Sequence, residues 1–374
     1  MNYKFIITGG GTSGHINPAI SIADAITQRC KQQGDNCDII FTGREKGLEN
    51  ELVSKAGYEM KYIEARPFPM RPTPKLFAAI KALYVGRKQC AKIISDFAPD
   101  AVIGTGGYVC APLLLEASKK KIPVFLHESN AFPGRANKLL ARKATVVMTG
   151  FSNHSSTFKN ARKAIFTGNP IRTALISSCN EVDVKSSLGI DKSMKIVFIM
   201  GGSLGAKTLN EFALEASRSD VFSDTHFVLS AGKQQQQAFM DSVVDKPNNL
   251  TIMEHIDNPY QLLSQADVSI TRSGAVTCAE VAAVGACSIL VPYPHAAHDH
   301  QTFNATMLSD PGAAIQISDS DVAQGKLDSI LRDLLDDNKK QETMRSNAKK
   351  LAVMDSDKRI ADAIFGQIKV KQNG

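Results

Sequence analysis

His15 ends a glycine-rich segment near the start of the chain, Thr8-Gly-Gly-Gly-Thr-Ser-Gly-His15, whose glycines have the G-x-G-x-x-G spacing. The apolar residues 5–7 before it predict a buried strand, and the pattern after it predicts a helix from Pro18. Glycine lets a backbone approach a ligand closely, and the N–H groups at a helix N-terminus favour an anion. The segment therefore predicts an anion-binding loop with one titratable imidazole at its edge.

Five further segments place glycines or polar side chains at the end of a predicted strand or the start of a predicted helix. They are Gly104–Tyr108, His127–Asn130, Gly201–Gly205, Arg272–Glu280 and Pro292–Gln301. Ligands of open parallel sheets bind at the carboxyl ends of the strands. Both halves of the chain therefore contain candidate binding residues.

The first loop alone suggests a dinucleotide site, but the second predicted strand argues against one. A dinucleotide-binding domain places Asp or Glu at the carboxyl end of that strand, where it binds the ribose. Here the strand ends in Thr42-Gly43-Arg44, and Asp35 and Asp38 lie at its other end. An NAD-dependent oxidoreductase is therefore disfavoured.

Predicted strands and helices alternate along the whole chain, which is typical of parallel sheets covered by helices. The 374 residues exceed what one hydrophobic core usually organises. We therefore expect an α/β protein with two Rossmann-like domains. The first comprises residues 1–170 and a final helix at about 355–374, the second comprises residues 171–354, and the turn-forming segment 168–172 is the hinge.

The composition is that of a globular protein, with 43% hydrophobic and 22% charged residues. No run is as apolar and long as a membrane span, and the N-terminus lacks the pattern of a signal peptide. The seven cysteines are scattered singly, which argues against a disulfide framework or a zinc site. The net charge of +7 fits anionic ligands or an anionic membrane, but the basic residues form no aromatic-interleaved stripe, so nucleic acid is disfavoured.

The segment 66–81 combines apolar and basic side chains, and two interpretations of it remain open. Four prolines between residues 66 and 74 predict a loop, which a helix from Lys75 follows. The helix has either a core-facing stripe with a solvated basic face, or a surface patch for anionic membranes. The patch would consist of the apolar Phe68, Met70, Leu76 and Phe77, surrounded by Arg66, Arg71, Lys75 and Lys81.

Over its full length the sequence resembles the MurG family, bacterial transferases that add N-acetylglucosamine to the lipid-linked muramyl-pentapeptide precursor of peptidoglycan. Each motif alone is weak, but all of them occur in order and at family-like spacing. They are Gly9–His15, Gly104–Tyr108, His127–Asn130, Gly168–Arg172, Gly201–Ala206, Arg272–Glu280, and Asp299–Gln301 with Asn304. Two positions depart from the family pattern: Ser13, where many relatives have glycine, and His298, where aspartate is common.

The resemblance implies a GT-B fold, in which two Rossmann-like domains face across a cleft and the last helix returns to the first domain. It implies inverting transfer from UDP-N-acetylglucosamine to the 4-hydroxyl of the muramyl sugar in undecaprenyl-pyrophosphoryl-muramyl-pentapeptide. The enzyme would be a peripheral protein on the cytoplasmic face of the inner membrane. We expect no cofactor and no obligatory metal, although a divalent ion could assist.

The resemblance also assigns candidate site residues. In the donor site, Glu280 would accept hydrogen bonds from the ribose hydroxyls, and the backbone of Ile256 would contact uracil. Arg172 and Ser203 would bind the donor diphosphate. The full substrate-binding set is Thr12, Ser13, Gly14, Asn130, Arg172, Ser203, Ile256, Ala275, Val276, Thr277, Cys278, Ala279, Glu280, His300 and Gln301, of which His300 and Gln301 would contact sugar hydroxyls. The acceptor diphosphate would be bound by Gly11, Gly14, Gly106, Gly107 and Tyr108.

His15 is the candidate general base. Inversion is a single displacement, so the 4-hydroxyl must lose its proton as it attacks, and an imidazole with an ordinary pKa of about 6.5 suits that task. Two alternatives stay open: His15 only orients the acceptor diphosphate or caps its helix, or Glu128 is the base. Asn130 belongs to the first domain but would contact the donor, which requires domain closure.

Three other classes of function compete with the transferase. They are an NAD-dependent oxidoreductase, a non-catalytic protein that binds nucleotide sugars, and another nucleotide-sugar enzyme of the same fold, such as an epimerase. Binding of nicotinamide would indicate the oxidoreductase. If His15 or Glu280 were dispensable, the chain could be a non-catalytic binding protein, and the sugar product would identify an epimerase.

Overall fold

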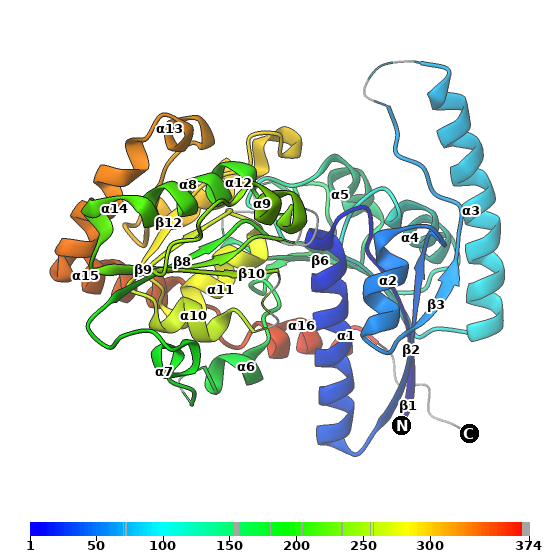
Figure 1. The fold of residues 1–374 in the computed structure, drawn as a ribbon. Helices are drawn as coiled ribbons and strands as arrows, with labels where there is room; N and C mark the ends of the chain where they lie inside the picture. Colours follow the sequence, from blue (N-terminus) through cyan, green and yellow to red (C-terminus); the bar gives the residue numbers. More distant parts are fainter. Residues whose placement is uncertain are drawn as a thin grey trace. The chain divides into compact units, whose positions relative to one another are not determined.

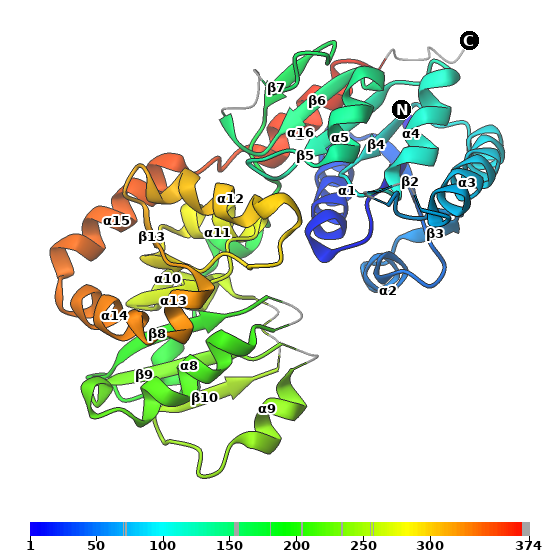
Figure 2. The same cartoon turned by 90° about the horizontal axis from the view of Figure 1, so that it is seen from above.

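The computed structural model describes residues 1–69, 71, 73–152, 157–179, 181–202, 205–232, 235–254, 256 and 258–368. The chain divides into two compact units, Met1–Ile171 with Asp355–Gly374, and Arg172–Met354. Each unit has one parallel sheet with helices on both faces (Figures 1 and 2). The predicted α/β architecture of two Rossmann-like units is therefore confirmed.

The sheet of the first unit has seven strands in the order β3-β2-β1-β4-β5-β6-β7, and every pairing in it is parallel. The first six follow the Rossmann order. Its strands are β1 (Asn2–Thr8), β2 (Asn36–Gly43), β3 (Glu59–Tyr62), β4 (Ala101–Gly104), β5 (Val124–Glu128), β6 (Val146–Thr149) and β7 (Ala164–Phe166).

Successive residues of β1 point to opposite faces of the sheet and so divide its core in two. Phe5 and Ile7 pack with the residues of α1 and α16, whereas Ile6 packs with those of α3 and α4. The helices of this unit are α1 (Ser13–Gln33), α2 (Leu48–Lys55), α3 (Lys75–Phe97), α4 (Cys110–Lys119), α5 (Arg135–Leu140) and α16 (Ser356–Phe365). Every core residue of β1 is fully buried, as its apolar run predicts.

The second unit repeats this plan with six parallel strands in the order β10-β9-β8-β11-β12-β13. The strands are β8 (Lys195–Met200), β9 (Thr225–Ser230), β10 (Leu250–Met253), β11 (Val268–Thr271), β12 (Ser288–Leu290) and β13 (Ala314–Gln316). The helices are α6 (Thr173–Ser177), α7 (Val184–Leu188), α8 (Lys207–Arg218), α9 (Gln236–Ser242), α10 (Tyr260–Gln265), α11 (Ala275–Val284), α12 (His300–Ser309), α13 (Asp319–Ala323), α14 (Lys326–Asp336) and α15 (Asn338–Leu351).

Two helix starts differ from those that the sequence predicts. The first helix begins at Ser13 rather than Pro18, so Pro18 lies inside it and His15 lies in its first turn. A proline there removes one backbone hydrogen bond, which the buried apolar face of the long helix offsets. The helix expected near Thr302 begins at His300, directly after a short 3-10 turn at Ala297–Asp299.

Candidate functional site

The first glycine loop joins β1 to α1 and packs tightly against the second, which follows β4. A methyl group at Gly9 would lie 2.1 Å from Oγ1 of Thr105, and one at Gly107 would lie 2.2 Å from the carbonyl oxygen of Gly10. The N–H of Gly10 donates to the carbonyl of Gly106 at 3.4 Å. The sequence therefore needs glycine in both loops because their backbones touch, and the two predicted loops form one structure.

The N-terminus of α1 opens at these loops. Thr12 at its N-cap makes no side-chain capping hydrogen bond, and no acidic side chain lies in the first turn. N–H groups at such a helix start are suited to an anion. Thr12, Ser13 and Gly14 are exposed or partly exposed there, and Gly11 has a φ of 89°, which favours glycine.

His15 is half-buried between the two loops. Its Nδ1 hydrogen bonds with Oγ1 of Thr12 at 3.2 Å, and its carbonyl accepts from Oγ1 of Thr105 at 2.7 Å. The ring lies against Gly106, where a methyl group would be 2.8 Å from Cδ2 and 3.1 Å from Nε2 of His15. A side chain at residue 106 would displace the imidazole, so the second loop fixes the position of the predicted base.

Tyr108 lies beside the first glycine loop, and Arg44 lies beside Tyr108. The Tyr108 ring would lie 3.4 Å from a methyl group at Gly11, and the Arg44 guanidinium lies 5.5 Å from the ring centroid. Arg44 also donates from N and Nε to Oε1 of the buried Glu49, at 3.1 and 3.3 Å. Arg44 therefore places a cation beside the loop, at the position where a dinucleotide-binding domain has an acid.

Glu128 ends β5 and is buried, and its carboxylate accepts four hydrogen bonds. Oε1 accepts from N and Nδ2 of Asn130 at 2.9 and 3.2 Å, and Oε2 accepts from N of Gly134 at 3.0 Å and Nδ2 of Asn137 at 2.8 Å. Burial raises the pKa of Glu128, and these donors oppose the rise. The carboxylate therefore holds the loop between β5 and α5, and its oxygens are already occupied by donors.

The histidine of the same motif has a structural environment. Nε2–H of His127 donates to the carbonyl of Gly168 at 3.1 Å, and Nδ1 accepts from the Ser129 hydroxyl at 3.2 Å. Burial lowers the pKa of His127 to about 4. This ring is therefore neutral near pH 7 and ties the end of β5 to the predicted hinge segment.

Asn137 on α5 lies beside His15 and Gly106, although its sequence motif predicted no role for it. Its Nδ2, which donates to Glu128, also lies 3.2 Å from where a methyl group on Gly106 would be, the same point that Nε2 of His15 approaches. Its buried Oδ1 has no hydrogen-bond partner in the part of the chain that the structure describes. Its position seven residues after the His127–Asn130 motif is the signal in the sequence that could have placed Asn137 near this site.

In the second unit, β8 is followed by Gly201 and Gly202, and α8 begins at Lys207 without a side-chain cap. Gly205 has a φ of 82°, and a methyl group there would lie 2.3 Å from the carbonyl oxygen of Ala231. This loop therefore also requires glycine at a close approach. The predicted Ser203 lies outside the described residues.

Arg172, Tyr260 and Glu280 come together in the second unit. The Tyr260 hydroxyl donates to Oε1 of Glu280 at 2.9 Å and lies 3.4 Å from the backbone N of Arg172, which donates to it. The Arg172 guanidinium lies 5.6 Å from the centroid of the Tyr260 ring. Arg172 and Glu280, both predicted to bind the UDP-sugar, are thus joined by a tyrosine to which the sequence assigned no role.

Glu280 lies on α11, whose N-terminus is a second uncapped helix start. Gly274 at the N-cap provides no side-chain hydrogen bond, and the first turn has no acidic residue. Ala275, Cys278 and Glu280 are buried, whereas Val276, Thr277 and Ala279 are partly exposed. Burial raises the pKa of Glu280, while the Tyr260 hydroxyl and Arg172 lower it.

The loop before α12 is held by a buried arginine and contains backbone strain. Arg272 lies 2.5 Å from Asp319 and donates to the carbonyls of Val291 and Pro292 at 3.3 and 3.2 Å. His298 and Asp299 have φ of 56° and 54°, a left-handed conformation that is unfavourable for residues other than glycine. Strain of this kind is common at ligand-binding loops.

Gln301 and His300, expected at the donor sugar, begin α12. Oε1 of Gln301 accepts from the N–H of Tyr293 at 2.9 Å, and its carbonyl accepts from the Ser273 hydroxyl at 2.8 Å. His300 hydrogen bonds through Nδ1 with the carbonyl of Ala297 at 2.8 Å. Ile256 is partly exposed, and its side chain provides no further guide to its role.

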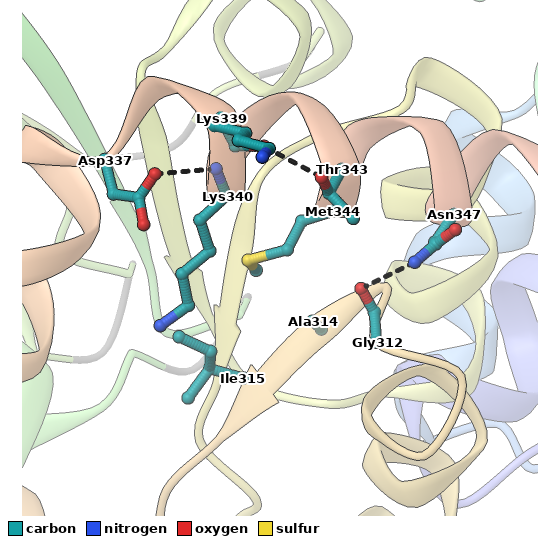
Figure 3. A pocket seen from close by; sticks show the side chains of 9 residues that line it. All are labelled: Gly312, Ala314, Ile315, Asp337, Lys339, Lys340, Thr343, Met344 and Asn347. Carbon is teal, nitrogen blue, oxygen red and sulfur yellow. Dashed lines mark hydrogen bonds between the residues drawn. The ribbon is translucent and has the colours of Figure 1, made fainter.

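Figure 3 shows a hollow of the second unit that none of these loops lines. The hollow has a volume of about 440 Å³ and lies between β13 and α15. It is lined by Gly312, Ala314, Ile315, Asp337, Lys339, Lys340, Thr343, Met344 and Asn347. None of the predicted site residues lines it, and among the described residues no group of three or more His, Cys, Asp or Glu could hold a metal ion.

Comparison with known proteins identifies both units. Residues 5–149 match the glycosyltransferase family 28 N-terminal domain, and residues 196–360 match the C-terminal domain of the same family. Both units also resemble glycosyltransferases and UDP-N-acetylglucosamine 2-epimerases of low sequence identity. One example is the Neisseria meningitidis epimerase bound to UDP-GlcNAc, at 15% identity, a TM-score of 0.63, and coverage of 98% of this chain and 100% of that chain. At this identity the likeness shows the fold alone.

Closer relatives share one name. A UDP-N-acetylglucosamine–N-acetylmuramyl-(pentapeptide) pyrophosphoryl-undecaprenol N-acetylglucosamine transferase of Acetivibrio thermocellus is 38% identical, with 99% of this chain and 100% of the relative covered. The same transferase of Finegoldia magna is 36% identical, with 97% of each chain covered. The crystal structure of Acinetobacter baumannii MurG is 29% identical, has a TM-score of 0.74, and covers 97% of this chain and 99% of that chain. The chain therefore belongs to the MurG family, the N-acetylglucosamine transferases of glycosyltransferase family 28.

Proposed function

We propose that this chain is a hexosyltransferase that moves N-acetylglucosamine from UDP-N-acetylglucosamine to the 4-hydroxyl of a lipid-linked N-acetylmuramyl-pentapeptide, a step of peptidoglycan synthesis. The observation that carries the proposal is the full-length match to transferases with this name. The two glycine loops, each at an uncapped helix start, support it because donor and acceptor are both diphosphates.

The acceptor diphosphate is assigned to the first unit, at Gly11, Gly14, Gly106, Gly107 and Tyr108. Contacts between the two loops bring their backbones together, and Arg44 adds a cation beside Tyr108. Thr12 and Ser13 belong to the same helix start. The N–H groups of these loops and of the α1 start favour an anion.

His15 is assigned as the general base. The 4-hydroxyl oxygen forms a bond to the anomeric carbon of the donor sugar, the bond from that carbon to the UDP oxygen breaks, and UDP leaves with the electron pair. The hydroxyl proton passes to the His15 imidazole, whose position is set by Thr12 and Gly106. Glu128 is the weaker candidate because four donors already occupy its oxygens.

UDP is assigned to the second unit. The N-termini of α8 and α11 and the Arg172 guanidinium would bind and stabilise the departing diphosphate, with Ser203 nearby in sequence. Glu280 would accept from the ribose hydroxyls, and the backbone of Ile256 would contact uracil. Gln301 and His300 would contact the sugar, and Asn130 would reach the donor from the first unit.

An apolar, basic surface of the first unit supports the membrane interpretation of segment 66–81 over the core interpretation. Phe77 on α3 is 78% exposed, and Ile80 and Tyr84, one and two turns on, are 50% and 60% exposed. Phe68, in the loop before α3, is 46% exposed. The described basic residues Arg66, Arg71, Lys75 and Lys81 are exposed around them, and Met70 lies outside the described residues. We assign this surface to an anionic membrane that carries the acceptor.

The described part of the chain contains no helix long and apolar enough to span a bilayer. Because the proposed acceptor is lipid-linked, we place the protein as a peripheral enzyme on the cytoplasmic face of the inner membrane, where the acceptor is reached from the surface.

Transfer of labelled N-acetylglucosamine from UDP to a lipid-linked muramyl-pentapeptide tests the function directly. We expect transfer from UDP-N-acetylglucosamine and little from UDP-glucose. Conversion of UDP-N-acetylglucosamine to an isomeric sugar without an acceptor would instead indicate an epimerase, and absence of any transfer would refute the proposal.

Vesicle binding tests the surface. Replacing Phe68, Leu76 and Phe77 with Ser should release the protein from anionic vesicles and leave UDP affinity intact. The matched control replaces Val221 and Val244 of the second unit, which are 55% and 71% exposed, with Ser. Equal vesicle binding by both variants would remove the membrane assignment.

A further inference from the structure

Tyr260 has an environment unlike that of an ordinary core aromatic residue. It is the first residue of α10 and is fully buried. A tyrosine hydroxyl has one proton to donate and lone pairs to accept, and both capacities are used here. The hydroxyl donates to Glu280 and accepts from the backbone N–H of Arg172.

The geometry leaves one carboxylate oxygen of Glu280 for a ligand. Tyr260 binds Oε1 at 2.9 Å, and within the described ranges no other residue is recorded as donating to Glu280. A buried carboxylate without such a donor would be free to rotate, because its torsion is soft. The tyrosine hydroxyl therefore fixes the plane of the carboxylate and directs Oε2 to another partner.

The same ring supports Arg172. The guanidinium lies over the Tyr260 ring at 5.6 Å, an attractive arrangement for a cation and an aromatic face. Arg172 is exposed, whereas Tyr260 and Glu280 are buried, so the rigid ring is the fixed part of the group. Together the three residues present a cation and a carboxylate on one side of the second unit.

We infer that Tyr260 is a positioning residue of the nucleotide site, which orients Glu280 toward the ribose hydroxyls and Arg172 toward the diphosphate. The inference rests on the proposed function for the identity of the nucleotide. Tyr260 acts through its two neighbours and does not itself contact the nucleotide.

Electrostatics agree with this role. Burial raises the pKa of Glu280, and the hydrogen bond from Tyr260 and the charge of Arg172 pull it down. The other titratable neighbour, Cys278, is buried, and burial together with Glu280 raises the pKa of its thiol, so it stays neutral. Removing the Tyr260 hydroxyl should therefore raise the pKa of Glu280 further and favour its protonated form.

The test is the affinity of the full chain for UDP and 2′-deoxy-UDP, measured by calorimetry for the wild type and Tyr260→Phe. The wild type should bind UDP at least 10-fold more tightly than 2′-deoxy-UDP, because the 2′-hydroxyl of the ribose donates to a charged group. In Tyr260→Phe, UDP affinity should fall about 10-fold and the preference for UDP should nearly vanish. Retention of the preference for UDP, whether or not both affinities fall, would show that the Tyr260 hydroxyl does not orient Glu280 and would overturn the inference.

Two controls make the result specific. Tyr58→Phe removes another hydrogen bond from a tyrosine to a carboxylate, the exposed bond from Tyr58 to Asp24 at 2.6 Å in the first unit, and should leave both affinities unchanged. In a Glu280→Gln background, Tyr260→Phe should have no further effect on the preference for UDP. A full additional effect there would mean that Tyr260 does not act through Glu280.

The pH dependence gives a second measurement. Because ionised Glu280 accepts from the ribose more strongly than the neutral acid, the loss of UDP affinity on acidification should begin at higher pH in Tyr260→Phe than in the wild type. Coincident profiles would contradict the inference. If the wild type binds UDP with the expected preference but transfers no sugar, the proposed function fails while the role of Tyr260 is still measured.

Discussion

Each unit has a strand, a glycine loop and a helix at the equivalent position of its sheet. The two units differ in the charge of the buried side chain that holds a neighbouring loop. In the first unit the loop after β5 is held by Glu128, a carboxylate surrounded by N–H donors. In the second, the loop after β12 is held by Arg272, a guanidinium that donates to carbonyls and pairs with Asp319.

Under the proposed function, this difference would let one fold plan bind two different ligands. The glycine loops alone only permit close approach of an anion. The proposal assigns ligand identity to side chains near these loops: His15 and Asn137 in the first unit, and Arg172 and Glu280 in the second. If the two sets of residues act separately, a change in one unit should leave the ligand affinity of the other unit intact.

The largest effect is expected from His15→Ala. Loss of a general base should lower kcat by a factor of about 10² to 10⁴, while UDP affinity stays unchanged because UDP is assigned to the other unit. Steady-state transfer kinetics and UDP calorimetry measure the two quantities. Parallel loss of both would remove the base assignment and the division between the units.

Next is Arg272→Met, which leaves the partly buried Asp319 and two carbonyls without the guanidinium, although Thr208 still donates to Asp319. Loss of these interactions should destabilise the second unit by about 1–3 kcal/mol and raise KM for the donor. Thermal unfolding measures the stability. The matched control, Lys326→Met, removes an exposed pair with Asp321 and should change stability by less than about 1 kcal/mol. Equal destabilisation by both variants would contradict the role of Arg272.

The effect of Glu128→Gln should be confined to the first unit. Its amide NH₂ would replace an oxygen that accepts two hydrogen bonds, leaving donors facing each other at a cost of about 1–3 kcal/mol. Transfer should slow as the Asn130–Asn137 loop loosens, and UDP affinity should fall less than transfer, because Asn130 is the one residue of this loop assigned to the donor. A fall in UDP affinity as large as the fall in transfer would show that the two units are not independent.

The smallest effect concerns Asp357, near the point where the chain returns to the first unit. Burial and the nearby Asp24 raise the pKa of Asp357 to about 7, although the N–H of Ile171 lowers it. The folded state therefore binds this proton more tightly than the unfolded chain, so stability falls as pH rises from about 4 to 7 and the loss is complete above pH 7.

Asp357→Asn should remove that dependence. The variant should be more stable than the wild type at pH 8 by about 1–2 kcal/mol and no more stable at pH 5. Denaturant unfolding at the two pH values measures the difference. The same gain at both values would show that titration of Asp357 is not its origin.

Much of the fold could be predicted because local patterns agree with it. The apolar run of β1 and the alternation of strands and helices predict the two parallel sheets that the structure confirms. The start of α1 could not be placed, since proline usually marks a first helical turn, whereas here the buried face of the helix outweighs one lost hydrogen bond.

The candidate sites were only partly predictable. Glycines and helix starts can be recognised from local sequence. They predicted the two loops that contact each other in the first unit. Tyr260 and Asn137 could not be found in this way, because their roles depend on contacts with residues 20 and 9 positions away, respectively. Whether segment 66–81 faces the core or the surface depended on the packing of α3, which its mixed pattern leaves undecided.

The return of α16 to the first unit has a consequence for the order of events during synthesis. Ile360 and Ile364 belong to the same core as Phe5 and Ile7, and the ring of Phe365 contacts those of Tyr3 and Phe5 at 5.1 and 5.8 Å. A ribosome must therefore finish residues 172–354 before it supplies the side chains that complete the first core. Domains usually complete in the order in which they emerge from the ribosome. In this chain the N-terminal unit, translated first, is the last to close, and a nascent chain that stops before residue 356 exposes the α16-facing side of the β1 and α1 core.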